Sequence, residues 1–447
     1  MKKFLFIVII SMIFSNTLFA QLYTLRENQG MLDGGFGVTW IDGQPFYSFH
    51  LRPEFAFSKI GVGFDFKLEY GTDGKVRTEN FNEFSDYLSI IRYIRYGYKG
   101  DPFYARLGAL DYATLGHGSI MYLYNNSLSY DTRKVGLAFD VDFTTFGVES
   151  VYSAFGEAGI VGLRGYARPL QFTDLRSVPV IGQLETGVSV VSDFHQKAGV
   201  VQGNYNPAEN KFNATQDEGS ITIVGFDIGL PIVNTSMLNL DLYFDYNKII
   251  NFGDGAATGF IFSLNGLGLV DIRTRLERRI NGDEYIPSYF NSFYEIERFR
   301  LDKSSNTFMS KAQALKNAGP AGNGWYGELL ITLLGTFDVL GSYQRLDKDP
   351  KSGILHIHTE IMPEGIPYVF RAGYDKVNIR NEKDLFKLDD RSYLFAELGY
   401  KPLPYLIVSL VYHWTFTPIR DADNNVLDYE PQKKIEPRIS FVYPLNF

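Results

Sequence analysis

Apolar and polar residues alternate along two neighbouring segments of the chain, residues 47–57 and 60–70. In the first segment the odd positions hold aromatic residues, Leu and Pro, while most even positions hold Ser, His, Arg or Glu. The alternation restarts after the dipeptide Ser58-Lys59, with Asp65, Lys67 and Glu69 on the polar side. Because successive side chains of a strand point to opposite faces, this pattern predicts a β-hairpin with one apolar and one charged face.

The same alternation recurs along the rest of the chain, for example in residues 135–143, 238–247, 355–361 and 406–416. A tilted strand crosses the hydrocarbon core of a bilayer in roughly 9–11 residues, which is the length of most of these segments. Candidate strands begin near residues 34, 46, 60, 87, 103, 134, 146, 159, 180, 219, 237, 256, 267, 324, 336, 353, 367, 391, 405 and 433. The sequence therefore predicts an all-β protein.

Two all-β architectures are compatible with this alternation, a soluble β-sandwich and a transmembrane antiparallel β-barrel. Charged residues occupy successive positions of the polar face, as a wet lumen requires. The connections also alternate between very short and long, whereas those of sandwiches are more even. The chain is rich in Tyr (30), Phe (37) and Gly (43), the composition of a twisted sheet with aromatic girdles. These features favour the barrel.

The N-terminal segment has the organisation of a secretory signal peptide. Lys2 and Lys3 precede an apolar run over residues 4–14, and a polar stretch then leads to Ala20. We expect cleavage before Gln21, so that residues 1–20 are a signal peptide and residues 21–447 form a single barrel domain. Loss of the two lysines would change the formal charge from −8 to −10. No later apolar run is long enough for a transmembrane helix.

The last residues alternate as well, with apolar residues at every second position from Ile435 to the terminal Phe447. This ending resembles the C-terminal signal of Gram-negative outer-membrane β-barrel proteins of the porin-like type, although it matches no specific subfamily. The resemblance implies insertion into outer-membrane lipid and recognition of the strand ending in Phe447 by the barrel-assembly machinery. It leaves open whether the barrels associate into a homo-oligomer.

Strand parity gives a count of about 20, within a range of 16–22. Short turns of such barrels face the periplasm and long loops face outward, which places residues 71–86, 193–218, 279–323 and 417–432 outside. Counts from the two ends of the chain agree only if residues 111–133 contribute no wall strand. We expect this segment to fold inward and narrow the pore, with Leu115, His117 and Ser119 as the candidate constriction. The alternative is an ordinary external loop.

The long connection over residues 279–323 carries two further signals. Apolar residues have roughly helical spacing over residues 304–318, which predicts a helix capped by Ser304 or Ser305. An aromatic cluster upstream is expected to pack against another part of the protein. The cluster comprises Tyr285, Tyr289, Phe290, Phe293 and Tyr294.

Composition and motifs exclude several kinds of site. The acidic balance argues against nucleic-acid binding, and the absence of Cys excludes disulfides and thiolate chemistry. His117 and Ser119 alone specify no hydrolase geometry. His356, His358 and Glu360 share one strand face and are expected to line the lumen. Residues 421–425 lack the spacing of a calcium-binding loop. We expect no enzymatic activity, no metal and no cofactor.

The charged residues of the inward faces are the best candidates for function. The candidate pore-lining residues are Arg52, Glu54, Asp65, Lys67, Glu69, Arg106, Arg164, Asp241, Asp245, Arg273 and Arg275. Opposed charges create a transverse field that favours polar solutes and, because the signs are mixed, gives little ion selectivity. The sequence thus predicts a channel for passive diffusion of small hydrophilic solutes. The alternative is that these charges pair and fill the lumen of a non-conducting structural or interaction barrel, for instance in a secretion or surface-attachment system.

Overall fold

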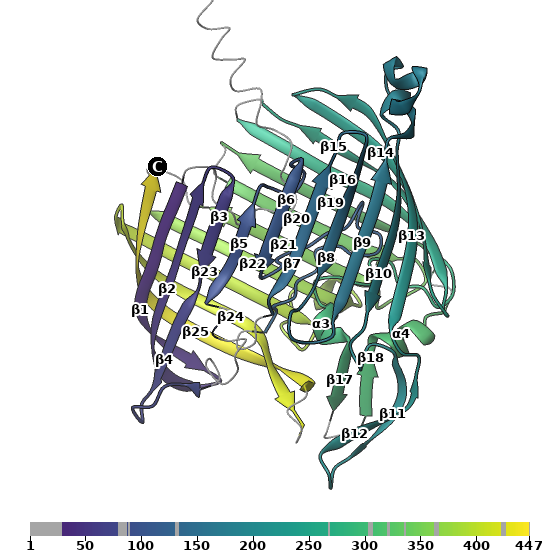
Figure 1. Ribbon diagram of the computed structural model, residues 1–447. Helices are drawn as coiled ribbons and strands as arrows, with labels where there is room; N and C mark the ends of the chain where they lie inside the picture. Colours follow the sequence, from purple (N-terminus) through teal and green to yellow (C-terminus); the bar gives the residue numbers. More distant parts are fainter. Residues whose placement is uncertain are drawn as a thin grey trace, which may run out of the picture.

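The computed structural model shows one large antiparallel β-sheet closed into a barrel (Figure 1). It describes residues 29–78, 87, 90–129, 134–266, 269–302, 307–319, 322–334, 337–361, 366–421 and 426–446. The predicted signal peptide and Phe447 lie outside the described residues. Among the described residues, no helix is both long and apolar enough to cross a membrane.

Within the described part of the chain the barrel wall has twenty strands, as predicted. The sheet contains twenty-one segments, but β3 and β4 both pair with β2 and are two halves of one strand interrupted at Asp65. The wall segments are β1 (Gln29–Ile41), β2 (Gln44–Phe57), β3 (Ile60–Phe64), β4 (Phe66–Gly71), β5 (Ile91–Tyr96), β6 (Phe103–Gly108), β7 (Gly136–Asp142), β8 (Phe146–Tyr152), β9 (Ile160–Ala167), β10 (Glu185–Asp193), β13 (Ile221–Asn234), β14 (Leu238–Ile249), β15 (Asp254–Leu264), β16 (Val270–Asn281), β19 (Gly322–Leu333), β20 (Phe337–Leu346), β21 (Gly353–Ile361), β22 (Tyr368–Ile379), β23 (Ser392–Leu403), β24 (Leu406–Arg420) and β25 (Val426–Asn446).

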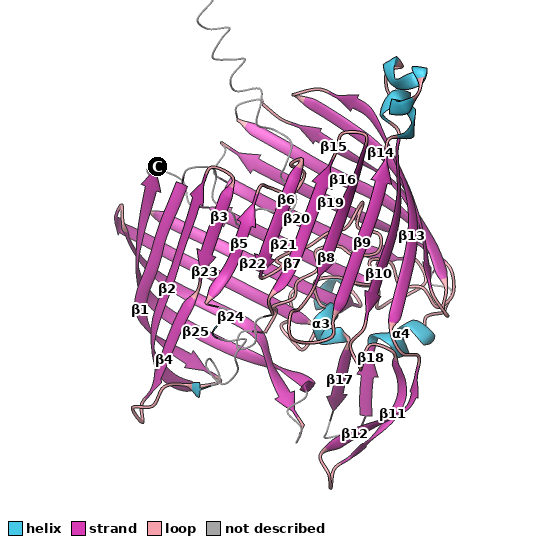
Figure 2. Ribbon diagram, viewed as in Figure 1, coloured by secondary structure: helices cyan, strands magenta, loops and turns pink. Residues whose placement is uncertain are grey.

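The first and last strands close the barrel. β1 pairs antiparallel with both β2 and β25, and Gly34 lies opposite Leu51 on one side and Phe441 on the other. Among the described residues every wall strand therefore has two neighbours, except that the half-strand β4 pairs with β2 alone. The C-terminus lies at the end of the barrel that carries the short turn Ser58-Lys59, and most long connections lie at the other end (Figures 1 and 2). The exception is the connection between β9 and β10, whose 3₁₀ turns lie at the end of the C-terminus.

The outer surface of the wall is apolar because the alternation places one set of side chains outward. Leu242 and Phe244 of β14 are 43% and 41% exposed, whereas Asp245 between Phe244 and Tyr246 is 1% exposed. Large apolar side chains on other strands, such as Phe36 and Leu410, are exposed in the same way. An apolar belt around a barrel with a polar interior is the arrangement that a bilayer requires.

Residues 109–129 lie inside the barrel instead of forming a wall strand or a loop outside it. We call this segment the strap. It folds back on itself through backbone hydrogen bonds between Ala113 and Tyr124, and it reaches the inner face of β24, where the Thr415 hydroxyl donates to the Leu128 carbonyl at 2.7 Å. The expectation that this segment folds inward agrees with these contacts.

A second segment, residues 285–298, packs against the strap inside the barrel. It carries the aromatic cluster and the one-turn helix α3 (Tyr294–Glu297). The backbones of Ile120 and Tyr122 exchange hydrogen bonds with Phe290, each at 3.1 Å. The two segments share one apolar core, which includes Leu110, Leu115, Ile120, Met121, Tyr124, Tyr285, Tyr289, Phe290 and Tyr294. The predicted packing of the aromatic cluster is therefore confirmed. The expectation that all of residues 279–323 lie outside is wrong for residues 285–298, because their apolar side chains pack in the interior.

Two small hairpins extend the barrel at the long-loop end, β11 (Val200–Asn206) with β12 (Lys211–Asp217), and β17 (Phe299–Asp302) with β18 (Thr307–Ser310). The prediction of a helix over residues 304–318 is wrong in its first half, because Phe308 belongs to β18, where it stacks on Phe299 and contacts the tilted ring of Phe212. The helix is α4 (Lys311–Lys316), and its cap is Ser310, whose hydroxyl accepts from the Gln313 amide at 2.9 Å.

Several predicted boundaries are also wrong; β1, for example, begins at Gln29 and not near residue 34. β25 begins at Val426, not near residue 433, because β24 and β25 stay paired far beyond the apolar belt, so residues 417–432 are mostly strand. β10 begins at Glu185, not near residue 180, because residues 169–183 form three short 3₁₀ turns. Most of the suggested calcium-like stretch, residues 422–425, lies outside the described residues.

Candidate functional site

A polar chamber of about 350 Å³ lies beside the strap in the barrel interior. Its wall is formed by inward-facing residues of β1, β2, β4 and β21 to β25, and the strap forms one side of it. Charged and aromatic residues of the lining include Asp33, His50, Arg52, Glu54, Asp65, Lys67, Glu69, Tyr112, Glu360, Arg371, Tyr393, Phe395, His413, Lys434, Glu436 and Arg438. Because the first and last strands are neighbours only in the closed barrel, closure of the barrel creates this chamber.

Hydrogen bonds and ion pairs orient the polar side chains in the chamber wall. The imidazole of His50 lies between Asp65, with Nε2 to Oδ1 at 3.0 Å, and Arg438, with Nδ1 to Nη1 at 3.0 Å. Lys434 donates to Glu69 at 2.9 Å across the β1–β25 closure. Such pairs orient the wall side chains and offset the cost of burying their charges.

Charges of both signs remain available to a solute. Seven carboxylates line the chamber among the described residues, against six lysines and arginines and two histidines. Asp33 interacts electrostatically with Arg438 and Glu360 with Arg371, and both carboxylates line the chamber. The chamber therefore offers paired charges that are fixed in place and two carboxylates that could receive a donor from a solute.

An aromatic side adjoins these charges. Phe395 and His413 have ring centroids 5.1 Å apart, and Tyr393 extends the same inward face of β23. On the strap, Tyr112 packs edge-on against His356 of β21 at 5.0 Å. Flat rings next to hydrogen-bonding groups can hold the apolar face of a polar solute while the charges hold its polar groups.

Other inward-facing charges hold the strap in place. Arg106 of β6 donates from Nε to the Ala109 carbonyl at 2.8 Å and from Nη2 to Asp111 at 2.9 Å, and thereby fixes the start of the strap. Arg164 of β9 donates to both carboxylate oxygens of Asp227 at 3.0 and 2.6 Å, and also to Glu149 and Glu185. These arginines therefore serve the strap and the wall, and neither lines the chamber.

The middle of the strap contacts the opposite wall through His117. Its Nδ1 lies 2.8 Å from Asp245 of β14, and its ring stacks on Tyr243 with centroids 4.6 Å apart. Burial opposes protonation of this imidazole, but the charges of Asp245 and Asp227 and the hydrogen bond to Asp245 together raise the pKa of His117. Gly116 and Gly118, with φ of +56° and +88°, make the sharp turn that presents His117 to the wall.

The structure thus divides the predicted site residues into two groups. Arg52, Glu54, Asp65, Lys67 and Glu69 line the chamber. Arg106, Arg164, Asp245 and Arg275 hold internal contacts; Arg275 is ion-paired with Glu277 and donates to the Tyr243 hydroxyl at 2.8 Å. Asp241 and Arg273 interact with each other on the wall outside the chamber lining. Of the candidate constriction, Leu115 is buried in the apolar core, His117 contacts Asp245, and the Ser119 carbonyl accepts from the Ser288 amide at 2.8 Å.

Sequence analysis missed the chamber residues contributed by the last strands. Lys434, Glu436 and Arg438 alternate with apolar residues in β25, so the pattern that identified the β2 charges could have identified them. Arg371 of β22 pairs with Glu397 of β23 at 3.1 Å, and only the registers of these strands bring the two together.

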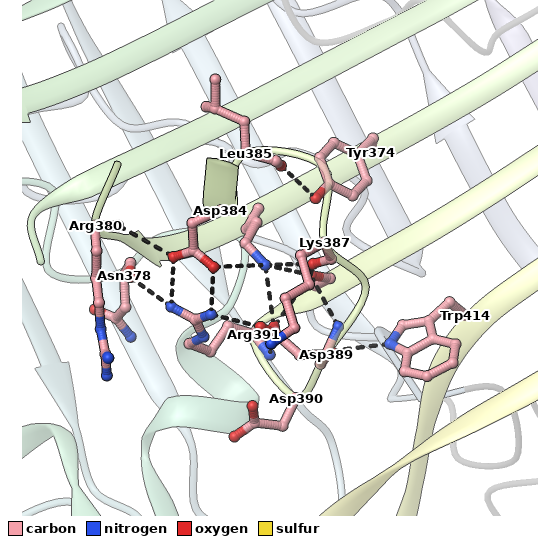
Figure 3. A network of polar contacts seen from close by, with 12 residues as sticks. Tyr374, Asn378, Arg380, Asp384, Leu385, Lys387, Asp389, Asp390, Arg391 and Trp414 are labelled. Atoms are coloured by element: carbon pink, nitrogen blue, oxygen red, sulfur yellow. Dashed lines mark hydrogen bonds and ion pairs between the residues drawn. The ribbon is translucent and has the colours of Figure 1, made fainter. Parts of the chain in front are cut away.

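A separate polar network fixes the connection between β22 and β23 at the long-loop end (Figure 3). Arg391 forms paired hydrogen bonds with Asp384 at 2.9 and 2.7 Å, and the Trp414 indole donates to the Asp389 carbonyl at 2.9 Å. The hydrogen bonds from Arg391 lower the pKa of Asp384 to about 2. This network lies outside the chamber lining and is structural.

The sequence matches no family model and no curated protein. Among solved structures, OccK11 (OpdR) of Pseudomonas aeruginosa is similar, with 10% identity, coverage of 93% of this chain and 95% of that chain, and a TM-score of 0.32. Wzi, a carbohydrate-binding β-barrel involved in group 1 capsule assembly in Escherichia coli, is 10% identical over 96% of this chain and 86% of its own, with a TM-score of 0.35. The copper transporter OprC is 8% identical over 93% and 81%, with a TM-score of 0.36. At this level of identity the likenesses concern barrel architecture and identify no substrate.

Proposed function

We propose that this protein is a channel through which small hydrophilic solutes diffuse passively, by way of the charged chamber beside the strap. The chamber itself carries this proposal, because it is a polar space of about 350 Å³ inside a barrel whose outer surface is apolar. Fixed charges of both signs solvate a polar solute and reject an apolar one. Since the strap occupies part of the cross-section, we expect a selective channel of low conductance.

The chamber favours small solutes that combine a positively charged group with other polar groups. Asp33 and Glu360 can accept hydrogen bonds from an ammonium or guanidinium group, while Arg52 and Lys67 face the same space. Zwitterions would meet both signs of charge. Because the two signs nearly balance, the channel should discriminate only weakly between simple anions and cations.

A non-conducting structural or interaction barrel is the second candidate. The apolar core shared by the strap and residues 285–298 favours it, because that core fills the part of the interior where Leu115, Met121, Tyr289 and Phe290 meet. A barrel filled in this way could serve as a rigid support for the hairpins at its long-loop end.

Single-channel recording in a planar bilayer separates the two candidates. The test variant replaces residues 111–133 by a short Gly-Ser linker between the adjacent strands β6 and β7, and the matched control shortens the exposed tip of the β11–β12 hairpin. We expect small conductance steps from the intact protein, several-fold larger steps without the strap, and no change in the control. Folded, heat-modifiable protein that shows no conductance would support the second candidate.

We also propose that the barrel lies in the outer membrane of a Gram-negative cell, with the long connections outside, after removal of residues 1–20. Recognition of the final strand by the barrel-assembly machinery belongs to the same proposal. The apolar belt supports the membrane location. Mass spectrometry of the protein from isolated outer membranes should find Gln21 as the first residue. Recovery of the intact N-terminus, or of the protein in the inner membrane alone, would contradict this location.

A further inference from the structure

Three side chains that can act as metal ligands meet where His117 contacts the barrel wall. His117 of the strap, Asp227 of β13 and Asp245 of β14 each place a nitrogen or carboxylate oxygen within 4.8 Å of the other two. A small cavity of about 10 Å³, the room of one water-sized group, lies between them and is also lined by Ser119 and Asn247. We propose that His117, Asp227 and Asp245 bind one Zn²⁺ ion, which fixes the middle of the strap to the barrel wall.

An unsatisfied oxygen is the second observation that indicates a ligand. Asp245 is 1% exposed, and its Oδ2 is buried with no hydrogen-bond partner among the described residues. Leaving a buried carboxylate oxygen unpaired costs free energy. The other oxygen, Oδ1, is hydrogen-bonded to His117 Nδ1 at 2.8 Å. On a tetrahedral zinc ion with ligand distances of about 2.0 Å the two atoms would lie about 3.3 Å apart, so a shift of about half an ångström would make room for the ion.

The surroundings of the three residues would orient them as ligands. Arg164 donates to both oxygens of Asp227 and leaves lone pairs of the carboxylate available. The Tyr243 ring stacks on His117 and fixes the plane of its imidazole. Partners of this kind, one step removed from the metal, commonly fix the geometry of protein zinc sites.

The local charge favours a cation. Arg164 is shared by Asp227, Glu149 and Glu185. Asp245 pairs with His117 and, among the described residues, has no lysine or arginine within 4.0 Å. A cation bound here would compensate the Asp245 carboxylate.

The donor set selects zinc over calcium or magnesium. Imidazole nitrogen and carboxylate oxygen are both ligand types that zinc accepts, and three protein ligands leave a fourth position for water. Calcium takes six to eight oxygen ligands and magnesium keeps several waters, whereas this site offers three protein ligands and little further room.

Metal binding can be measured on the full-length protein in detergent, purified without a histidine tag and treated with a chelator. Titration with Zn²⁺ by calorimetry, together with native mass spectrometry, should give one ion per chain. H117Q should bind at least about tenfold more weakly, and D245N should behave likewise. H195Q is the matched control, because His195 lies in another connection away from the cavity, and its affinity should equal that of the wild type. Ca²⁺ and Mg²⁺ should not compete.

X-ray absorption at the zinc edge of the wild-type protein provides a test that needs no variant. We expect a first shell of nitrogen and oxygen with the scattering of a single imidazole. Absence of stoichiometric Zn²⁺, binding that H117Q leaves unchanged, or a shell without histidine would each overturn the proposal. These measurements do not depend on conduction, so a failed channel experiment would leave the zinc site standing and a failed zinc experiment would leave the channel standing.

Discussion

Arg164 illustrates how single residues keep charge inside this barrel. Its guanidinium contacts Asp227, Glu149 and Glu185, and the residue is 2% exposed. An arginine can satisfy several carboxylates at once because its five N–H donors lie in one plane. The buried charged side chains of the wall therefore depend on one another: removal of one member of a group leaves the charges of the others uncompensated.

Replacement of Arg164 by Met should destabilise the barrel by about 3–5 kcal/mol, because buried carboxylates would lose their shared cation. Urea-induced unfolding in lipid vesicles, followed by Trp fluorescence, measures this change. R176Q, an exposed arginine in a 3₁₀ turn, is the control and should leave the free energy of unfolding within about 0.5 kcal/mol of the wild type. A loss of less than 1 kcal/mol in R164M would mean that water solvates these carboxylates.

At the scale of elements, the strap depends on a few side chains that satisfy its backbone. Asn126 accepts from the Leu110 amide at 2.9 Å and donates to the Ser153 carbonyl at 2.9 Å, and so joins the strap to the loop after β8. A segment that forms no sheet ladder needs such contacts, since its buried backbone groups would otherwise remain unpaired.

The N126A variant should loosen the strap while the wall stays intact. Loss of these hydrogen bonds leaves buried groups unsatisfied and should lower the free energy of local opening by about 1–3 kcal/mol. Hydrogen–deuterium exchange should then speed up at strap amides such as those of Ala113 and Tyr124 but not in β14. The exposed substitution S177A should change neither. Equal acceleration in strap and wall would show that the strap does not open independently.

The connection between β22 and β23 should respond to acid. The folded pKa of Asp384 is about 2, below its ordinary value, so its contribution to stability is complete above the ordinary pKa of about 4 and is lost as the pH falls through 2. Trp414 reports on this connection through its hydrogen bond to Asp389. Its emission, isolated by subtraction of the W414F spectrum, should shift between pH 4 and 2. D384N should show the shifted emission already at neutral pH. If neither acid nor D384N shifts the Trp414 emission, the ion pair of Arg391 and Asp384 does not hold this connection in place.

At the scale of the whole molecule, the barrel separates an apolar outside from a charged inside. Leu242 faces outward near the middle of β14, whereas Met237 lies in the turn just before that strand. In a bilayer these two exposed positions differ in depth, although both would be solvated alike in a soluble sandwich.

Arginine at these two positions distinguishes a membrane barrel from a soluble one. L242R should lower the free energy of unfolding in vesicles by about 2–4 kcal/mol, and M237R by at most about 1 kcal/mol, because the cost of a charge on the lipid face falls toward the interface. Urea titration of both variants in the same lipid measures the difference. Equal effects would contradict the membrane-facing assignment of the outer belt.

The sequence by itself determined the wall of this protein. Alternation specified the strands and their faces, and strand parity removed residues 111–133 from the wall, because a bilayer imposes opposite chemistry on the two sides of every strand. The alternation over residues 47–70 therefore corresponds to the observed strands β2, β3 and β4. The sequence determined strand ends such as the start of β25 less well, because β25 stays paired with β24 where the alternation of apolar and polar residues weakens.

Only the tertiary structure decided what fills the interior. The contacts that define it join residues far apart in the chain, such as His117 with Asp245 and Lys434 with Glu69. No local pattern encodes such pairs, because they depend on closure of the barrel and on the path of a strap that has no regular period. The sequence could place charges on the inner face, but it could not say which of them pair, which hold the strap and which face the chamber. Those outcomes follow from three-dimensional packing alone.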